Sequence, residues 1–181
     1  MDINSFSESL RTIIMKSLEM ATNSHNTEIT TIHLLYQIFS DNTIDGLLKK
    51  LDIDKDNCLG ICQNRMKNVA TVDYVPQPIF NRKVTESFSN ALNWAREHDE
   101  TYLTVATCFI FLLFNKSNVS NEILKNYPGL TMEGCLNTEL ERRGSKKMDE
   151  PTSELNLEAL EKYGHDLVQD VINGKIDPVI G

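Results

Sequence analysis

The sequence has few aromatic residues and no long apolar run. Aromatic residues make up 7% of its 181 residues, and only one of them is tryptophan. The densest apolar stretch, residues 106–114, is about half as long as the ~18 residues that a membrane-spanning helix needs. The start of the chain, Met1-Asp2-Ile3-Asn4, is neither basic nor followed by an apolar segment, as an export signal would be. We therefore expect a cytoplasmic protein with no membrane partner.

Positive charge is also in short supply. The chain holds 18 lysines and arginines against 26 aspartates and glutamates, a formal net charge of −8. Nucleic acids and anionic membrane surfaces would repel a protein with this net negative charge, so we expect no nucleic-acid partner. The 40% of hydrophobic residues is enough to bury a sizeable core and too much for a disordered chain.

The four cysteines lack the spacing of a metal site or of a redox motif. They are Cys58, Cys62, Cys108 and Cys135, with no Cys-x-x-Cys and no histidine grouped with a thiol. Zinc sites need such groupings, so we expect no metal ligand among them. Reduced cysteines that pack as small apolar residues are the simpler interpretation.

Motifs of catalysis are missing as well. The chain has neither Gly-x-Ser-x-Gly nor His-Glu-x-x-His. Gly174-Lys175 is followed by Ile176, and Gln169 stands where a phosphate-binding loop would have its first glycine. We therefore expect no catalytic residue, no ATP hydrolysis by this chain and no cofactor bound to it.

Apolar residues recur at steps of three and four along most of the chain, which predicts amphipathic helices. The first such segment runs from Phe6 to Ala21, and Ser5-x-x-Glu8 predicts a capping box at its start. Alternating strand-like patterns are scarce. The sequence predicts an all-α fold.

The helical pattern occurs twice. Adding 74 to an apolar position of the first half reaches an apolar position of the second, as in Leu10–Val84, Ile14–Phe88, Leu18–Leu92, Ala21–Ala95 and Ile29–Leu103. Single copies of such a repeat cannot bury their apolar faces alone. We predict two tandem four-helix repeats related by a pseudo-twofold axis, about residues 1–70 and 80–143. The connector 71–80 contains Pro76 and Pro78, which exclude a continuous helix there.

A different kind of sequence follows the repeats. Residues 144–154 are polar and contain glycine and proline, which predicts a linker. Beyond it, Leu155, Leu157, Leu160 and Tyr163 predict a short helix, and residues 167–172 a second one.

The last part of the chain resembles a known family. Residues 160–167 (Leu-Glu-Lys-Tyr-Gly-His-Asp-Leu) and 174–181 (Gly-Lys-Ile-Asp-Pro-Val-Ile-Gly) resemble the entry to the first AAA+ ATPase module of Clp ring chaperones. The duplicated helices resemble the Clp N-terminal domain, in which a Thr or Ser opens a His-Leu-Leu helix, as Thr30 and Thr31 do here before Ile32-His33-Leu34-Leu35. The resemblance implies a Clp N-terminal domain over 1–143, a linker over 144–154, and the beginning of an AAA+ module over 155–181, whose remainder would follow.

Within the family, the Leu-Glu-Lys-Tyr-Gly entry and the short linker with Arg143-Gly144 are most similar to ClpB-type disaggregases. The resemblance implies a non-catalytic module that recruits unfolded or aggregated polypeptide to hexameric AAA+ modules, which bind ATP and Mg. The alternative is the N-domain of a ClpC- or ClpA-like subunit of a Clp protease, which docks an adaptor protein and substrates.

For binding polypeptide, a furrow between the repeats is the natural candidate, because an apolar groove with few polar constraints accepts many sequences. Its candidate lining residues, near the repeat junction, are Phe6, Leu10, Tyr74, Val75, Phe80, Val84 and Phe88. Phe6, Leu10, Val84 and Phe88 fit the core better than an exposed groove. Tyr74 and Val75 lie on the proline-containing connector, where exposure is expected.

Other candidates come from the resemblance alone. Ser7 and Glu100 are similar to family residues linked to substrate handling, although they also fit a first-turn residue and a solvated loop acid. The family's usual acid before the histidine is replaced by Ile32 and by Ala106, which weakens the transfer of a site that uses those acids. Val179 and Ile180 lie in a segment that resembles the one against the adenine in complete ATPases.

Overall fold

Helices account for nearly all the regular structure of residues 3–163, the part of the chain that the computed structural model describes. The prediction of an all-α fold is confirmed. The elements, in order, are the 3₁₀ turn η1 (Ile3–Ser5), α1 (Glu8–Asn23), β1 (Glu28–Ile29), α2 (Thr31–Ser40), α3 (Asp45–Lys50), α4 (Lys55–Met66), β2 (Ile79–Phe80), α5 (Arg82–Glu97), α6 (Val105–Leu113), α7 (Asn118–Leu124), α8 (Met132–Arg143) and α9 (Ser153–Tyr163).

The starts of the helices repeat in the same register as the apolar residues. Ser7 caps α1 and Asn81, 74 positions later, caps α5; Thr30 caps α2 and Thr104 caps α6. Each cap side chain accepts a hydrogen bond from an amide of the first turn that would otherwise lack a partner. The predicted capping box at Ser5 is wrong, because Ser5 belongs to η1 and the residue that caps α1 is Ser7, two residues later.

The second helix of each repeat opens with a matched cap. The imidazole Nδ1 of His33 accepts from the amide of Thr30 (2.9 Å), so its Nε2–H donates to Asn26 Oδ1 (2.9 Å). Burial lowers the pKa of His33 to about 4, so the ring is neutral at physiological pH. In the second repeat Thr107 takes this place, and the Thr104 hydroxyl donates to it at 3.2 Å.

Two short backbone pairings cross between the repeats. Parallel strands β1 and β2 pair Ile29 with Phe80, and an isolated parallel bridge pairs Phe6 with Leu103. Since Phe6 and Phe80 are 74 positions apart, as are Ile29 and Leu103, these are the same contact made twice. Each repeat therefore pairs a short extended segment with the other, as strands β1 and β2 in one case and as a single bridge in the other.

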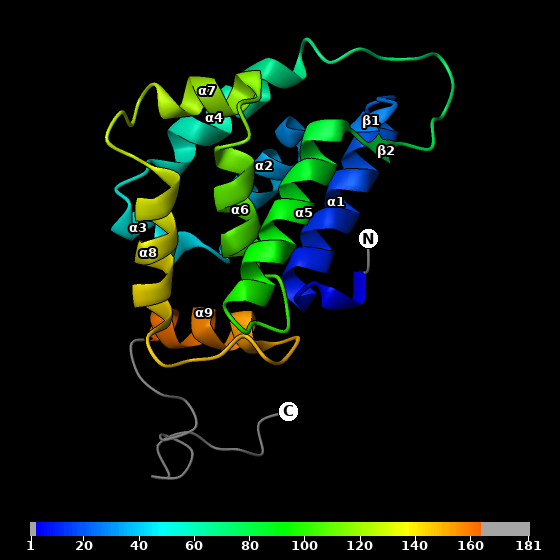
Figure 1. Cartoon of the computed structure of the whole chain (residues 1–181). Helices are drawn as coiled ribbons and strands as arrows, with labels where there is room; N and C mark the ends of the chain where they lie inside the picture. Colours follow the sequence, from blue (N-terminus) through cyan, green and yellow to red (C-terminus); the bar gives the residue numbers. More distant parts are fainter. Residues whose placement is uncertain (1–2, 164–181) are drawn as a thin grey trace.

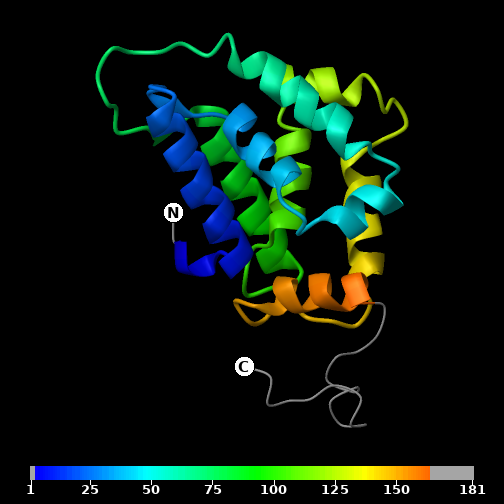
Figure 2. The ribbon, with the colours of Figure 1, turned by 180° about the vertical axis from the view of Figure 1, so that it is seen from behind.

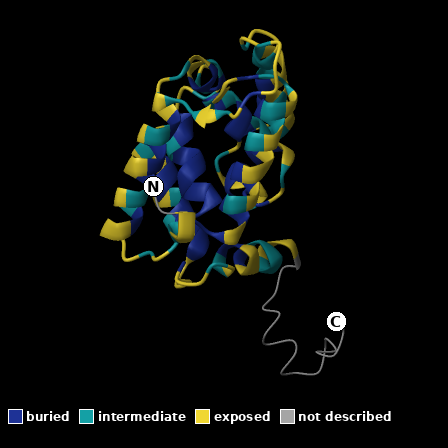
Figure 3. Cartoon of the chain, turned by 90° about the vertical axis from the view of Figure 1, so that its right-hand side faces the viewer, coloured by how far each residue is buried: buried dark blue, intermediate teal, exposed yellow. Residues whose placement is uncertain are grey.

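Phenylalanine rings close the core between the repeats. Phe88 of α5 contacts both Phe6 and Phe80, with ring centroids 5.6 and 5.5 Å apart, and Phe39 meets Phe109 edge-on at 5.5 Å. Buried residues occupy the inner faces of the helices and exposed residues the outer faces, as Figure 3 shows. The core is thus one continuous body shared by both repeats.

The helices form a bundle with two covered ends. α4 and α7 lie together across the upper end in Figure 1, and α9 crosses beneath the lower ends of α6 and α8; the reverse view in Figure 2 agrees. The linker was predicted over residues 144–154. Residues 144–152 run along this lower end in Figure 1, with Met148 buried, but Ser153 and Glu154 already belong to α9. Between residues 3 and 163, no helix is both long and apolar enough to cross a membrane. The helix predicted over 167–172, with Val179 and Ile180, lies outside the described residues.

Candidate functional site

The candidate residues do not form one site in the structure. Tyr74 and Val75 lie on the connector between α4 and β2, which arches away from the bundle at the upper right of Figure 1. Phe6 and Phe80 lie at the junction of the repeats, where both rings contact Phe88. Ser7, next to Phe6, is bonded to Glu154 of α9, and Glu100 pairs with Arg143 at the end of α8.

Large apolar side chains are exposed along the connector. Tyr74 is 59% exposed and Val75 73%, and Ile79 at the start of β2 is 68% exposed. The backbone beneath them is anchored, because His25 Nδ1 donates to the Tyr74 carbonyl (2.8 Å) and the amide of Val72 donates to the His25 carbonyl (2.9 Å). This apolar surface is therefore held in place rather than loosely attached.

Phe6 and Phe80 add little to the exposed apolar surface of the connector. Phe6 is 2% exposed and packs in the core, and Phe80 is half-buried against the ring of Phe88. In this conformation Phe80 alone of the two borders the connector, and the two phenylalanines act mainly as packing.

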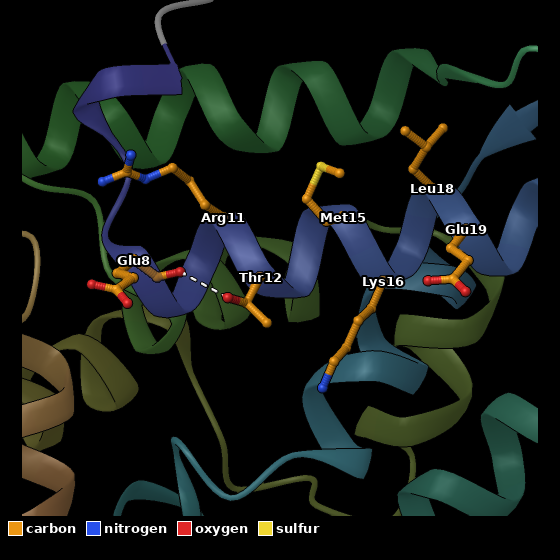
Figure 4. Close-up of a pocket in the computed structure, with 7 residues that line it drawn as sticks. All are labelled: Glu8, Arg11, Thr12, Met15, Lys16, Leu18 and Glu19. Atoms are coloured by element: carbon orange, nitrogen blue, oxygen red, sulfur yellow. Dashed lines mark hydrogen bonds between the residues drawn. The ribbon is translucent and has the colours of Figure 1, made fainter.

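The sequence did not reveal a hollow on the outer face of α1. It has a volume of about 520 Å³, and Figure 4 shows its side chains: Glu8, Arg11, Thr12, Met15, Lys16, Leu18 and Glu19. Arg11, Met15 and Leu18 point toward α5, and Met15 is 58% exposed. Met15 lies off the buried stripe of α1. An apolar residue outside that stripe was the one sign in the sequence of an apolar surface on this face of the helix.

Ser7 is almost fully buried beneath the start of α9. Its hydroxyl donates to Glu154 Oε1 at 2.9 Å. The same carboxylate accepts the amides of Val105 (2.8 Å) and Ala106 (3.0 Å) at the first turn of α6. Glu154 is 2% exposed, and this burial raises its pKa although the hydrogen bonds favour the charged form. Glu154 therefore caps the free amides at the start of α6 from outside the helix.

Glu100 pairs with Arg143 at the end of α8, and its side chain is 7% exposed. Arg143 also donates to Glu139 (2.8 Å) and to the hydroxyls of Thr104 (3.0 Å) and Thr107 (2.9 Å). Burial lowers the pKa of Arg143 to about 10, which still leaves it protonated at neutral pH. Glu100 is consequently part of a buried ion-pair network rather than a solvated loop acid.

The network continues to the far end of α9. Arg142 Nε donates to Glu139 Oε1 (2.6 Å), and its guanidinium also pairs with Glu161. Burial raises the pKa of Glu139 to about 7 despite the arginines beside it. Polar contacts therefore hold α9 near both of its ends: the hydrogen bonds that Glu154 accepts and the ion pair of Glu161 with Arg142.

The sequence analysis missed Glu139, Arg142, Arg143 and Glu154. The arginines stand three and four residues after Glu139, which is the spacing of ion pairs on one helix face. That signal was available, but it does not tell a buried pair from an exposed one.

Catalytic or metal-binding chemistry finds no support in the described part of the chain. No group of three His, Cys, Asp or Glu side chains there could hold a metal ion. The four cysteines are free and buried, and burial raises the pKa of Cys58 and Cys135 to about 11 and of Cys62 to about 12. Their predicted role as small apolar core residues is confirmed.

The sequence profile of one family, described as the Clp repeat (R) N-terminal domain, matches residues 5–127. The chain belongs to this family. Its matched region is a non-catalytic module of two repeats, in agreement with the fold.

Relatives of known name align with the whole chain. The chaperone protein ClpB of Bacillus anthracis is 27% identical over 189 aligned residues, which cover 100% of this chain and 21% of the relative. The chain thus spans about a fifth of the length of the curated relatives it matches.

Solved structures show the same fold. The Hsp104 N-terminal domain of Candida albicans has a TM-score of 0.71 at 17% identity, over 83% of this chain and 99% of that one. A ClpV N-domain in complex with a VipB peptide has a TM-score of 0.61 at 14% identity, over 76% and 86%. The Clp N-terminal domain of this chain therefore has the architecture of domains from several Clp-type ATPases.

Proposed function

We propose that this domain recruits unfolded or aggregated polypeptide to the ATPase ring of a ClpB-type disaggregase. The observation that carries the proposal is the anchored surface of exposed apolar side chains at Tyr74, Val75 and Ile79. Its support from relatives is the alignment of the whole chain with ClpB chaperones. In this proposal the longer protein is cytoplasmic and hexameric, and its AAA+ modules bind ATP and Mg.

Such a surface suits clients of many sequences. Apolar contact is non-directional, so the connector can accept any stretch that exposes hydrophobic side chains. Each contact is weak, but six domains tethered to one ring raise the effective concentration of binding sites around a single aggregate. Affinity of one isolated domain is then expected to be modest.

The test is fluorescence anisotropy of fluorescein-labelled, permanently unfolded casein titrated with the chain. We expect saturable binding with a dissociation constant on the order of 10–100 μM, typical of a weak, transient contact. A natively folded protein of similar size carrying the same label is the control and should not bind. A casein titration that stays linear to millimolar protein would contradict the proposal.

The hollow on α1 favours a second candidate, docking of an adaptor protein as in a ClpC- or ClpA-like protease subunit. Charged Glu8, Arg11, Lys16 and Glu19 surround Met15, and a mixed-charge rim around an apolar centre suits one specific partner. Salt separates the two candidates, because rim charges are screened above ~0.15 M ionic strength whereas apolar contact is not. Binding of casein that is unchanged between 0.05 and about 0.5 M salt favours the client-recruiting function.

A further inference from the structure

The connector turns alternate side chains toward solvent as it approaches β2. Exposed and covered residues follow one another there: Val75, Gln77 and Ile79 are exposed, and Pro76, Pro78 and Phe80 are buried or half-buried. A period of two is that of an extended strand, in which successive side chains point to opposite sides. A stretch of this kind has two ways to bind a polypeptide, through its exposed side chains or by pairing its backbone with the client as an added strand.

The backbone of β2 already uses one of its two edges. The amides of Ile79 and Asn81 donate to the carbonyl oxygens of Thr27 (3.2 Å) and Ile29 (3.0 Å). Because the N–H groups of alternate residues in a strand point to the same edge, the odd-numbered amides face β1 and the even-numbered positions face away from it. A client strand would therefore have to pair with the outer, even-numbered edge.

Prolines deprive that outer edge of hydrogen-bond donors. Its residues are Pro76, Pro78 and Phe80, and a proline has no N–H. A client strand lying along this edge would bring its own carbonyl oxygens to two positions where no donor meets them. These oxygens would lose their hydration without gaining a hydrogen bond, which is unfavourable. Proline on an exposed edge is a common way in which proteins prevent strand addition.

We propose that the connector binds clients through side chains alone, without backbone pairing between connector and client. In this mode, which rests on the proposed function and deepens it, the connector recognises aliphatic or aromatic side chains of a polypeptide in any backbone conformation. Val75 and Ile79 are at most about 14 Å apart along an extended chain, so one flexible segment can contact both. The client can also leave the connector without a ladder of hydrogen bonds being broken.

Removal of donors from the client backbone tests the mode of binding. The probes are a short, unstructured, leucine-rich peptide with a fluorescein label and its ester twin, in which esters replace the central peptide bonds and remove their N–H groups on both edges. We expect anisotropy titrations to give dissociation constants within about threefold of each other, because the side chains are unchanged. A larger loss of affinity for the ester twin would overturn side-chain recognition and leave the proposed function standing. If neither peptide binds, the proposed function fails, and the mode of binding fails with it.

Replacing Pro76 and Pro78 together tests whether these prolines block the outer edge. Pro76→Val with Pro78→Val supplies the missing N–H groups, so this variant should bind the amide peptide more than about threefold more tightly than the ester twin. The matched control is Pro128→Val, at an exposed proline between α7 and α8, which should bind both peptides alike. Equal binding of both peptides by the double variant would overturn the role assigned to the prolines.

Hydrogen exchange of the Ile79 amide, which should stay protected by Thr27, shows whether β2 still pairs with β1 in the double variant. The comparison of the two peptides on the unchanged chain decides the mode of binding even if that variant does not fold.

Discussion

The amide of Ser7 donates to the carbonyl oxygen of Leu103 at 2.8 Å. Its counterpart 74 positions along, from the amide of Asn81 to the carbonyl oxygen of Ile29, measures 3.0 Å. In each case the cap residue of the first helix in one repeat is fixed to the residue before the cap of the second helix in the other. The repeats therefore position each other's helix starts, and the surfaces at those starts depend on both.

Phe88 joins these two contacts through the core, since the rings of Phe6 and Phe80 both pack on it. We expect Phe88→Ala to lower the free energy of unfolding by about 3–5 kcal/mol, from lost burial and the cavity left behind. Urea denaturation followed by far-UV circular dichroism measures this change. Phe111→Ala, at a partly buried position, is the control and should cost less. A loss below about 1 kcal/mol at Phe88 would show that the core relaxes around the gap.

Glu139 is the carboxylate on which Arg142 and Arg143 both depend. We expect Glu139→Ala to destabilise the chain by about 3–5 kcal/mol, because it leaves two buried cations without their shared partner. Glu86→Ala removes the exposed pair with Arg82 and should cost about 0.5 kcal/mol or less. Thermal and urea unfolding of the two variants at one ionic strength gives the comparison; similar losses would mean that the buried network adds no more than a surface pair.

Because the pKa of His33 is lowered by folding, we expect the free energy of unfolding to decrease in acid. Its pKa is about 4 in the folded chain and 6.5 when unfolded, so only the unfolded state gains a proton as the pH falls between those values. The sign is therefore a free energy of unfolding that decreases toward low pH, by about 2–3 kcal/mol between pH 7 and about 4.5 from this group. The raised pKa of Glu139 acts in the opposite direction over the same range, so a variant is needed for comparison.

That variant is His33→Thr, which installs the residue that the second repeat has at Thr107. It should be less stable than the parent at pH 7, because the Asn26 contact is lost. Between pH 7 and about 4.5, however, the decrease in its free energy of unfolding should be about 2–3 kcal/mol smaller than the decrease in the parent. Urea denaturation at several pH values measures both slopes. Parallel slopes for the two proteins would exclude His33 as the titrating group.

In the proposed function, clients bind the exposed apolar side chains of the connector. Replacing both apolar tips, with Tyr74→Ser and Val75→Ser together, should weaken casein binding at least about fivefold, because the exposed apolar area falls. Ile3→Ser changes another exposed apolar side chain, 47% exposed and away from the connector, and should bind as the parent does. Equal weakening by both changes would indicate unspecific hydrophobic adhesion rather than a site on the connector.

Much of the fold could be predicted because helix periodicity is local. The 74-residue offset between apolar positions such as Leu10 and Val84 is enough to predict the two repeats. The polar residues Thr30 and Thr104 mark equivalent helix starts. The start of α1 was misplaced because Ser5 and Ser7 both fit a cap by type. Pairing of the adjacent backbone with Leu103 selects Ser7, and that partner lies in the other repeat.

The candidate site was less accessible to sequence reasoning. Exposure of Tyr74 and Val75 followed from the prolines of the connector, which keep it out of the helices. The role of Glu154 did not, because its partners Ser7 and Val105 lie 147 and 49 residues away in sequence. A glutamate in a polar segment carries no mark of burial until the helix ends that surround it have been assembled.

Pairing of short extended segments between the repeats makes this single chain equivalent to a closed dimer. Each half gives the other what a second subunit would give across a twofold axis. Duplication followed by fusion is the simplest history for such symmetry. Once the halves shared one chain, their equivalent surfaces could diverge, one left open to solvent and the other closed by a carboxylate of the same polypeptide.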